Sequence, residues 1–432
     1  MDITTERPDV AAKLAERDLT LDLARVACVV LVVVIHVLFA GVRVTDAGIE
    51  VEHTVELQPW FAAVTWIFEI MPLFFVVGGF ASATAYRSAR KRGASDADYV
   101  RGRLLRLARP ALPVFAFFGA TLLVIGATSV DRTLVSAVAV AVGSPLWFLS
   151  SFLIVQACVP LLLRLHERRP VVTLITLVAA AAAVDAMRTA SGEVLLGLPN
   201  VLFVWAACHQ LGFWMRDGFF ARRRPVELVG IIVLAYLALW GLVSTGAYSW
   251  NMLANQYPPT LPLVCLAVAQ AAALRLAYRP LSALMRTCAA RAVVYVVGSR
   301  AMTIYCWHSP AIMLLLGLQL LVPATLSEPG STRWWWERIL FTALVLALLW
   351  LLSLALARFE EAPPSVPAGS VAPGAARVAL ACVLFTTAPF LIAMLGMNTG
   401  LAVAGLVGTV AALRLVRPRT AADVGVRVPP SV

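Results

Sequence analysis

Long apolar runs are the feature that most limits how this chain can fold. About twelve segments come close to the roughly 20 apolar residues that a helix needs to cross a bilayer. Because hydrocarbon offers the backbone no water, such segments must satisfy their own N–H and C=O groups as helices. With 61% hydrophobic and only 14% charged residues, we expect an all-α integral membrane protein, a polytopic bundle of about 12 transmembrane helices. The expected spans are 21–41, 59–86, 111–129, 145–165, 171–187, 195–215, 226–246, 260–278, 299–321, 339–357, 377–396 and 400–416.

Basic residues are concentrated in alternate loops, which predicts how the bundle is oriented. The segment 87–109 is rich in arginine, whereas 247–259 carries no charged residue. The positive-inside rule then places 87–109 and both termini in the cytoplasm of a bacterial cell, with the bundle in its cell membrane. This distribution explains the net charge of +11, so the expected partner is the lipid bilayer and not a nucleic acid. The basic residues of the segment are Arg87, Arg90, Lys91, Arg92, Arg101, Arg103, Arg106 and Arg109.

The stretches between the expected spans are too short for a second soluble domain. The N-terminal segment has mixed charge, without the basic start and small-residue cleavage site of a signal peptide. The stretch 133–143 is too short to span and is expected to be re-entrant or interfacial. Seven cysteines form no CxxC pair, so neither a disulfide framework nor a metal site is expected. The expected units are a cytoplasmic segment 1–18, a membrane core 19–361 of about ten helices, a Pro/Gly/Ala linker 362–376, a C-terminal transmembrane pair 377–416 and a cytoplasmic tail 417–432.

The first expected span carries two ionisable residues, Arg25 and His36. They are eleven residues apart, close to three helical turns, so both project from one face with a rise of about 16 Å between them. Asp22, three residues before Arg25, lies on the same side and can pair with it. An ionisable group inside a span is a functional hypothesis by default. The structural alternatives are an arginine that snorkels to the membrane surface and a histidine that only hydrogen-bonds a neighbouring helix.

Six segments of the chain, in order, resemble the integral-membrane acyltransferase-3 family. The first, "LDLARVACVVLVVVIH", carries the Arg-x10-His signature of that family at Arg25 and His36. Two positions depart from the family pattern: Leu23 replaces a glycine, and Gly78 stands where a serine is usual, so any role of that hydroxyl is absent here. The resemblance extends over residues 17–363, and the other five segments are "MPLFFVVGGF", "RLLRLARPALP", "PLWFLSSFLIVQACVPLL", "SRAMTIYCWHSP" and "ARFEEAP".

The resemblance implies transfer of an acyl group, usually acetyl, from acyl-CoA to a hydroxyl of a glycan, a lipid-linked sugar or a secondary metabolite, without a metal. A hydroxyl is a poor nucleophile at neutral pH, and histidine is the usual general base that activates it. His36 is the only histidine of the first span, so it is the predicted base, or alternatively the carrier of a transient acyl-imidazole. Glu69 in the second span is predicted to orient His36, and His308 to hydrogen-bond the thioester or the acceptor. A structural ion pair or a protonated carboxyl for Glu69, and a structural histidine beside Pro310, remain as alternatives.

The donor carries phosphates, and arginine suits phosphate well. Arg25, at the inner end of the first span, is the predicted donor ligand, together with Arg103 and Arg106 of the basic segment. Anionic lipid headgroups would explain the same arginines. His209, with its neighbour Gln210, is predicted to line the donor entrance, with a core histidine as the alternative.

Two other classes of function stay open at this point. A proton-coupled transporter would use Arg25, Glu69, His36 and His308 as a relay, and its substrate flux would not need CoA. If the protein were a scaffold or anchor, replacing His36 by alanine would leave the phenotype unchanged. The depth of His36 in the outer half of its span favours an extracytoplasmic or lipid-linked acceptor. We expect His53 and His166 to be surface residues in loops.

Overall fold

The computed structural model describes residues 18–46, 48–128, 132–361 and 372–418. Within these ranges ten helices are long and apolar enough to cross a membrane, or eleven if one bent pair, Tyr278–Leu284 with Cys288–Ser299, is counted as a span. The all-α polytopic bundle is therefore confirmed. The expected twelve spans include two that form shorter helices, Pro262–Leu276 of 15 residues and Thr399–Leu415 of 17 residues.

The elements follow one another along the chain with a single β-hairpin among the helices. They are α2 (Leu19–Phe39), β1 (Ala40–Thr45), β2 (Gly48–His53), α3 (Phe61–Phe68), α4 (Met71–Lys91), α5 (Asp96–Gly126), α6 (Arg132–Gly143), η1 (Ser144–Leu146), α7 (Trp147–Arg168), α8 (Pro170–Ser191), η2 (Val194–Gly197), α9 (Asn200–Arg216), α10 (Pro225–Ser244), η3 (Leu253–Asn255), α11 (Pro262–Leu276), α12 (Tyr278–Leu284), α13 (Cys288–Ser299), α14 (Ala301–Leu320), η4 (Pro323–Thr325), α15 (Thr332–Ala355), α16 (Ala357–Glu360), α17 (Ala375–Leu395) and α18 (Thr399–Leu415).

The expected cytoplasmic loop 87–109 is wrong, because most of it is helical. Helix α4 continues to Lys91 and α5 already begins at Asp96, well before the expected span 111–129. Ser95 and Asp98 form a capping box, in which each side chain accepts a hydrogen bond from the backbone N–H of the other residue. The arginines from Arg101 onward therefore project from a helix and have defined directions.

Three further stretches differ from the sequence-based expectation. The stretch 133–143 is not re-entrant: α6, η1 and α7 together form one candidate span, Val135–Arg168, because the break at Ser144 and Pro145 is taken up by a single 3-10 turn. The expected span 59–86 is interrupted at Glu69 and Ile70, between α3 and α4. Part of the expected loop 42–58 forms the antiparallel hairpin of β1 and β2, which pairs Ala40 with His53.

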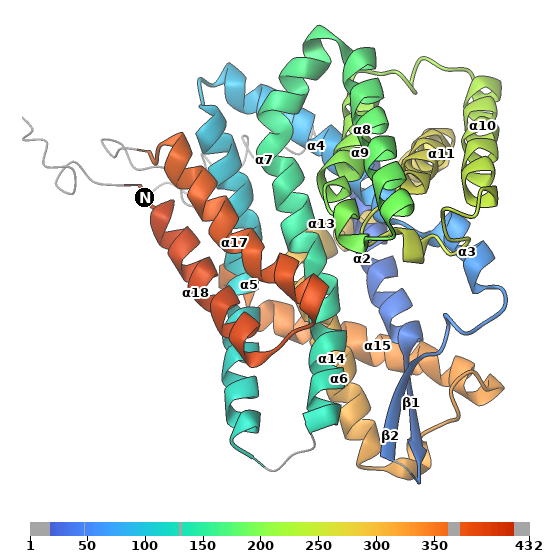
Figure 1. Cartoon of the computed structure of the whole chain (residues 1–432), viewed down its shortest axis with the longest axis vertical. Coiled ribbons are helices and arrows are strands. Elements are labelled where there is room, and N and C mark those ends of the chain that lie inside the picture. Colours follow the sequence, from blue (N-terminus) through green and yellow to red (C-terminus); the bar gives the residue numbers. More distant parts are fainter. Residues whose placement is uncertain (1–17, 47, 129–131, 362–371, 419–432) are drawn as a thin grey trace, which may run out of the picture.

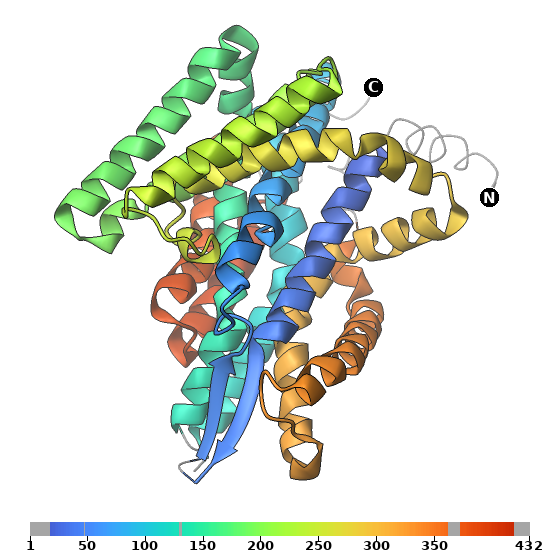
Figure 2. The ribbon, with the colours of Figure 1, turned by 90° about the vertical axis from the view of Figure 1, so that its right-hand side faces the viewer.

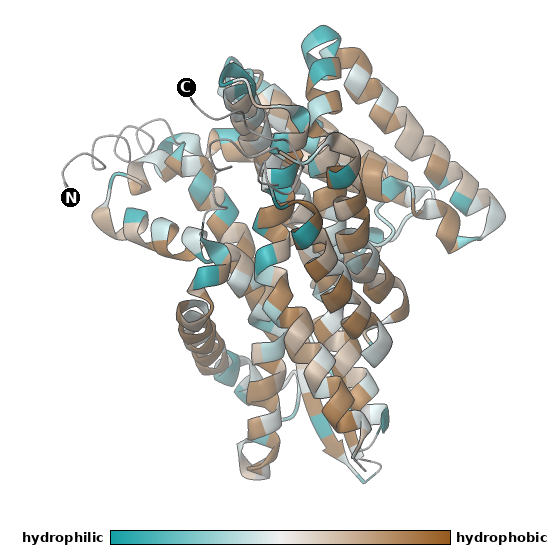
Figure 3. Cartoon of the chain, turned by 90° about the vertical axis from the view of Figure 1, so that its left-hand side faces the viewer, coloured by the Kyte–Doolittle hydropathy of each residue, from teal (hydrophilic) through white to brown (hydrophobic). Residues whose placement is uncertain are grey.

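Helix α2 crosses the bundle from the end at which Leu19 lies to the end that carries the hairpin (Figure 2). Hydrophilic residues gather toward the end opposite the hairpin, and apolar residues cover the length of the helices (Figure 3). Helices α4 and α9 pack most closely, since a Cβ on Gly79 would lie 2.0 Å from the carbonyl oxygen of His209. The C-terminal helices α17 and α18 pack beside α5 and α7 (Figure 1). This arrangement surrounds α2 with α4, α13, α14 and α15.

Candidate active site

Two cavities lie along α2, and we call them the inner and the outer cavity. The inner cavity, of about 400 Å³, is lined by Arg25 from the beginning of α2. The outer cavity, of about 360 Å³, is lined by His36 from the end of the same helix. Three residues, Val32, Met71 and Tyr305, line both cavities, and we call the boundary that they form the neck. The expected alignment of Arg25 and His36 on one helix face thus places them in two adjoining cavities.

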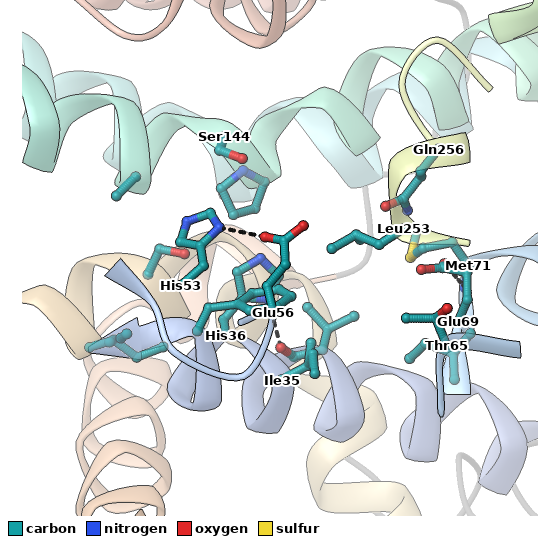
Figure 4. Close-up of a pocket in the computed structure, with 18 of the residues that line it drawn as sticks. Ile35, His36, His53, Glu56, Thr65, Glu69, Met71, Ser144, Leu253 and Gln256 are labelled. Carbon is teal, nitrogen blue, oxygen red and sulfur yellow. Dashed lines mark hydrogen bonds and ion pairs between the residues drawn. The ribbon is translucent and has the colours of Figure 1, made fainter. Parts of the chain in front are cut away.

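His36 exposes its second ring nitrogen toward the outer cavity. Its Nδ1 lies 2.8 Å from the carbonyl oxygen of Val32, one turn earlier in α2. Because a carbonyl oxygen only accepts, Nδ1 carries the proton and Nε2 keeps the lone pair. Figure 4 shows the ring among the residues that line the cavity. This is the tautomer in which a neutral imidazole can accept a proton or attack a carbonyl carbon.

The ring of His308 packs against the ring of His36. The two rings meet edge to face with their centroids 4.7 Å apart, and His308 Nδ1 donates to the carbonyl oxygen of Tyr305 at 2.5 Å. His308 Nε2 is buried and has no hydrogen-bond partner in the described part of the chain. The structure therefore brings the two predicted histidines together, but only His36 is among the residues that line the outer cavity.

Glu69 also lines the outer cavity, but the expected contact with His36 is not made. Its carboxylate accepts a hydrogen bond from the N–H of Met71 at 3.1 Å, and its main-chain oxygen accepts one from Gln270 at 2.6 Å. No hydrogen bond joins Glu69 to His36 among the described residues. The reason is local, because Glu69 ends α3 and its carboxylate serves the first turn of α4.

The three predicted donor arginines, Arg25, Arg103 and Arg106, all line the inner cavity. Arg25 forms the expected ion pair with Asp22, at 3.2 Å. The guanidinium carbon of Arg103 lies over the ring of Tyr99, 4.8 Å from the ring centroid. Three cations at one cavity mouth suit an anion with several charges. Four other arginines of the basic segment hold helices together: Arg87 and Arg90 pair with Glu167, Arg101 donates to the carbonyl of Val416, and Arg109 donates to the carbonyls of Arg358 and Glu361.

Sequence reasoning missed Glu360 as a residue of the inner cavity. One of its carboxylate oxygens accepts the N–H groups of Met302 and Thr303, at 2.7 and 2.9 Å, and so caps α14. Burial raises the pKa of the Glu360 carboxyl, although these backbone hydrogen bonds oppose the shift. The "ARFEEAP" segment marks the neighbourhood of Glu360 in the sequence, but its position beside the arginines depends on the fold.

His209 does not line the donor entrance, and that prediction is wrong. Its side chain is fully buried, with Nδ1 donating to the carbonyl of Phe75 at 3.0 Å and Nε2 3.4 Å from the amide nitrogen of Gln156. Gln156 and Ser82, which hydrogen-bond each other, line the inner cavity in front of it. Gly78 lines the same cavity, so Ser82 supplies a hydroxyl one turn beyond the position of the missing serine.

Two histidines were expected to be surface residues in loops. His53 is exposed but also lines a cavity, whereas His166 is buried and lines neither cavity. His53 lines the outer cavity, and its Nδ1 lies 3.0 Å from the carboxylate of Glu56, which lines it too (Figure 4). His166 is buried in α7 and contacts Asp217 and Gln210. Burial opposes ionisation of Asp217, but hydrogen bonds from Arg87 and His166 outweigh it and lower the pKa of that carboxyl.

The described residues contain no group of three or more His, Cys, Asp or Glu side chains that could hold a metal ion. His36 lies on the outer side of the neck, and the arginines Arg25, Arg103 and Arg106 line the cavity on its inner side.

Comparison with known proteins gives one match. A family model described as an acyltransferase domain, that of the acyltransferase-3 family, matches residues 18–354. No curated protein sequence and no solved structure matches the chain. The matched range holds every residue that lines the outer cavity, and every residue of the inner cavity except Phe359, Glu360 and Glu361. The chain belongs to the acyltransferase-3 family and is a multi-pass membrane acyltransferase.

Proposed function

We propose that the protein is a membrane O-acyltransferase that moves an acyl group, in the simplest case acetyl, from acyl-CoA in the inner cavity to a hydroxyl in the outer cavity. The observation that carries this proposal is the position of His36. His36 lines the outer cavity. Val32, whose carbonyl oxygen accepts the hydrogen bond from His36 Nδ1–H, lines both cavities. A reacting group held at the neck is therefore within reach of substrates on both sides.

The donor side of the proposal rests on the charge of the inner cavity. Arg25, Arg103 and Arg106 provide the guanidinium groups that phosphates prefer. The same cavity is also lined by Phe74 and Phe148 and by the neck residues Met71 and Tyr305. A donor with a phosphate-bearing head and a long, thin arm suits this set of residues, with the head at the arginines and the thioester at Met71 and Tyr305.

In the reaction, the hydroxyl oxygen forms a bond to the thioester carbon as the carbon–sulfur bond breaks. His36 Nε2 takes the hydroxyl proton as general base, and the proton then passes to the departing thiolate, which leaves as free thiol. In the covalent variant, Nε2 first forms a bond to the thioester carbon as the carbon–sulfur bond breaks and the thiolate departs. The hydroxyl oxygen then displaces Nε2 from the acyl carbon, and the hydroxyl proton passes to the thiolate. His308 is a positioning residue in both routes, since it packs against His36.

The test compares wild-type protein with His36→Ala in lipid nanodiscs, supplied with acetyl-CoA labelled in the acetyl group and with membrane lipids and soluble material from cells that carry the protein. A general base contributes roughly 10²–10⁴-fold, so we expect the alanine variant to lose at least that lower factor. His166→Gln is the matched histidine control, because His166 lies in neither cavity, and it should transfer label within about threefold of wild type.

Equal transfer by wild type and His36→Ala would contradict the proposal. Label that remains on wild-type protein after denaturation, and is absent from His36→Ala, would indicate the acyl-imidazole route. The transporter relay gains no support from the described residues, because Arg25 and His36 line different cavities and Glu69 has no hydrogen bond to His36.

A further inference from the structure

One wall of the outer cavity is also exposed on the outside of the bundle. Phe68, at the end of α3, lines the cavity and is 57% exposed, and Val140 of α6 lines it and is 45% exposed. Both residues lie inside candidate membrane spans, Phe61–Lys91 and Val135–Arg168. We take these two exposed apolar residues as the place where the outer cavity opens toward lipid.

A polar part of the cavity lining lies outside the spans. His53 and Glu56 follow the hairpin, between the candidate spans that end at Phe39 and begin at Phe61. Their side chains are 63% and 36% exposed while they pair with each other, and Asn251 adds a hydrogen bond to Glu56 at 3.4 Å. Phe39 stacks on His53, with ring centroids 5.2 Å apart, and meets His36 edge to face at 5.9 Å. The ring of Phe39 therefore lies between the His53–Glu56 pair and His36, the proposed base.

The rest of the lining is mostly apolar, with Ser144, Gln256 and Ser309 as polar residues besides Thr65 and Glu69. Thr65 already donates to Ala62 and accepts from Met252, and Glu69 accepts from Met71. A free sugar would leave most of its hydroxyls facing apolar side chains, and unpaired buried hydroxyls are costly. The apolar residues of this lining include Ile35, Phe39, Phe61, Val64, Ile70 and Leu253.

From these three observations, and resting on the proposed function, we infer that the acceptor is a hydroxyl-bearing amphiphile. Its apolar part enters from the bilayer past Phe68 and Val140, and its polar head is held by His53 and Glu56. This arrangement presents a hydroxyl near the boundary between head and tail to His36 Nε2. The residues assigned here bind the acceptor and do not take part in the exchange of bonds.

The first experiment asks which fraction receives the label. Membrane vesicles from cells that carry the protein are incubated with labelled acetyl-CoA and with the soluble fraction of the same cells, and then extracted into organic solvent. We expect most of the His36-dependent label in the organic phase. His36-dependent label found only in water-soluble products would overturn the amphiphile while leaving the acyltransferase intact. No His36-dependent label in either phase would instead overturn the proposed function.

The second experiment measures the Michaelis constants for the organic-phase acceptor and for acetyl-CoA separately. We expect Phe68→Asn, His53→Gln and Glu56→Gln each to raise the acceptor KM at least threefold and to leave the donor KM within twofold. Ile67→Asn and Glu50→Gln are matched controls: Ile67 is 63% exposed next to Phe68, Glu50 lies on β2 with His53, and neither lines the cavity. If the cavity variants and the control variants had the same acceptor KM, the assignment of Phe68, His53 and Glu56 to acceptor binding would be overturned.

Discussion

The inner and outer cavities are alike in size and share a helix, yet their linings differ. Both lie against α2 and use the same three neck residues, Val32, Met71 and Tyr305. The inner cavity brings together Arg25, Arg103 and Arg106 with Glu360 and Glu361, whereas the outer cavity offers two histidines, two glutamates and apolar side chains. The difference teaches that one helix can serve two unlike substrates if its polar residues are kept about three turns apart.

The charge difference also decides where each substrate can be stabilised. A polyanion gains from several guanidinium groups at once, and that gain grows when water is partly excluded. A neutral hydroxyl gains little from such a cluster and needs a base with a free lone pair. The separation of the two linings therefore keeps the cations of the inner cavity away from His36, where they would disfavour its uptake of a proton.

The largest expected effect comes from closing the neck. Val32→Phe adds volume at a buried position that lines both cavities, so a thioester in the inner cavity and a hydroxyl in the outer cavity no longer approach. Misplacement by about 1 Å can cost a factor of roughly 10², and we expect transfer to fall by at least about that factor. Equilibrium dialysis with labelled CoA should show donor binding within about threefold of wild type.

The control for this variant is Leu31→Phe, one position earlier on α2, because Leu31 is 37% exposed and lines neither cavity. It should keep wild-type transfer. Val32→Ala, which widens the neck, should retain transfer as well, so that loss follows from blockage and not from any change at the position. If a folded Val32→Phe protein transferred the acyl group at the wild-type rate, the proposal that substrates in the two cavities react across this neck would be wrong.

A smaller effect is expected when the charge of the inner cavity is reduced. Hydrogen bonds to charged groups contribute about 1.5–3 kcal/mol, so Arg103→Gln or Arg106→Gln should raise the donor KM about tenfold. The acceptor KM should stay unchanged, and the donor KM of wild type should rise with ionic strength. Arg92→Gln is the matched control, since Arg92 is exposed, lines neither cavity and donates a side-chain hydrogen bond to Ser88. An equal rise in both Michaelis constants would mean that the arginines hold the bundle and not the donor.

The parts of the site that lie on one helix could be predicted from the sequence. Arg25 and His36 share a face because the helical repeat sets the direction of each side chain, and the structure places them in adjoining cavities. The start of α5 was also readable, since Ser95 and Asp98 have the spacing of a capping box. The high charge of the segment hid that helix, because hydropathy ranks charged stretches as loops.

Contacts between distant elements could not be predicted in the same way. His209 and Gln156 are 53 residues apart, and nothing in either segment indicates that the amide stands between the imidazole and the cavity. His53 was expected to be a surface residue in a loop; its side chain is exposed, but it ends β2 and also lines the outer cavity. Glu69 was assigned to the middle of a span because the break before α4 has an apolar sequence on both sides.

The smallest expected effect distinguishes the two cavities through the C-terminal helices. A Cβ on Gly143 would lie 2.6 Å from Met397 and 2.9 Å from Ile392, and a Cβ on Gly405 would lie 2.5 Å from the ring of Phe115. Both Gly143→Ala and Gly405→Ala overpack α17 or α18 against the core, which costs about 1–3 kcal/mol. The two variants should therefore lower thermal stability to a similar extent.

Only Gly143→Ala should also change catalysis. Gly143 directly precedes Ser144 and Pro145, which line the outer cavity, so relief of the contact with Met397 must shift part of that wall. Phe115 lines neither cavity. We expect the acceptor KM to rise about threefold in Gly143→Ala alone, with the donor KM unchanged in both variants. A rise in both variants would mean that the C-terminal helices act through overall stability, because a merely loosened bundle has no reason to favour one cavity over the other.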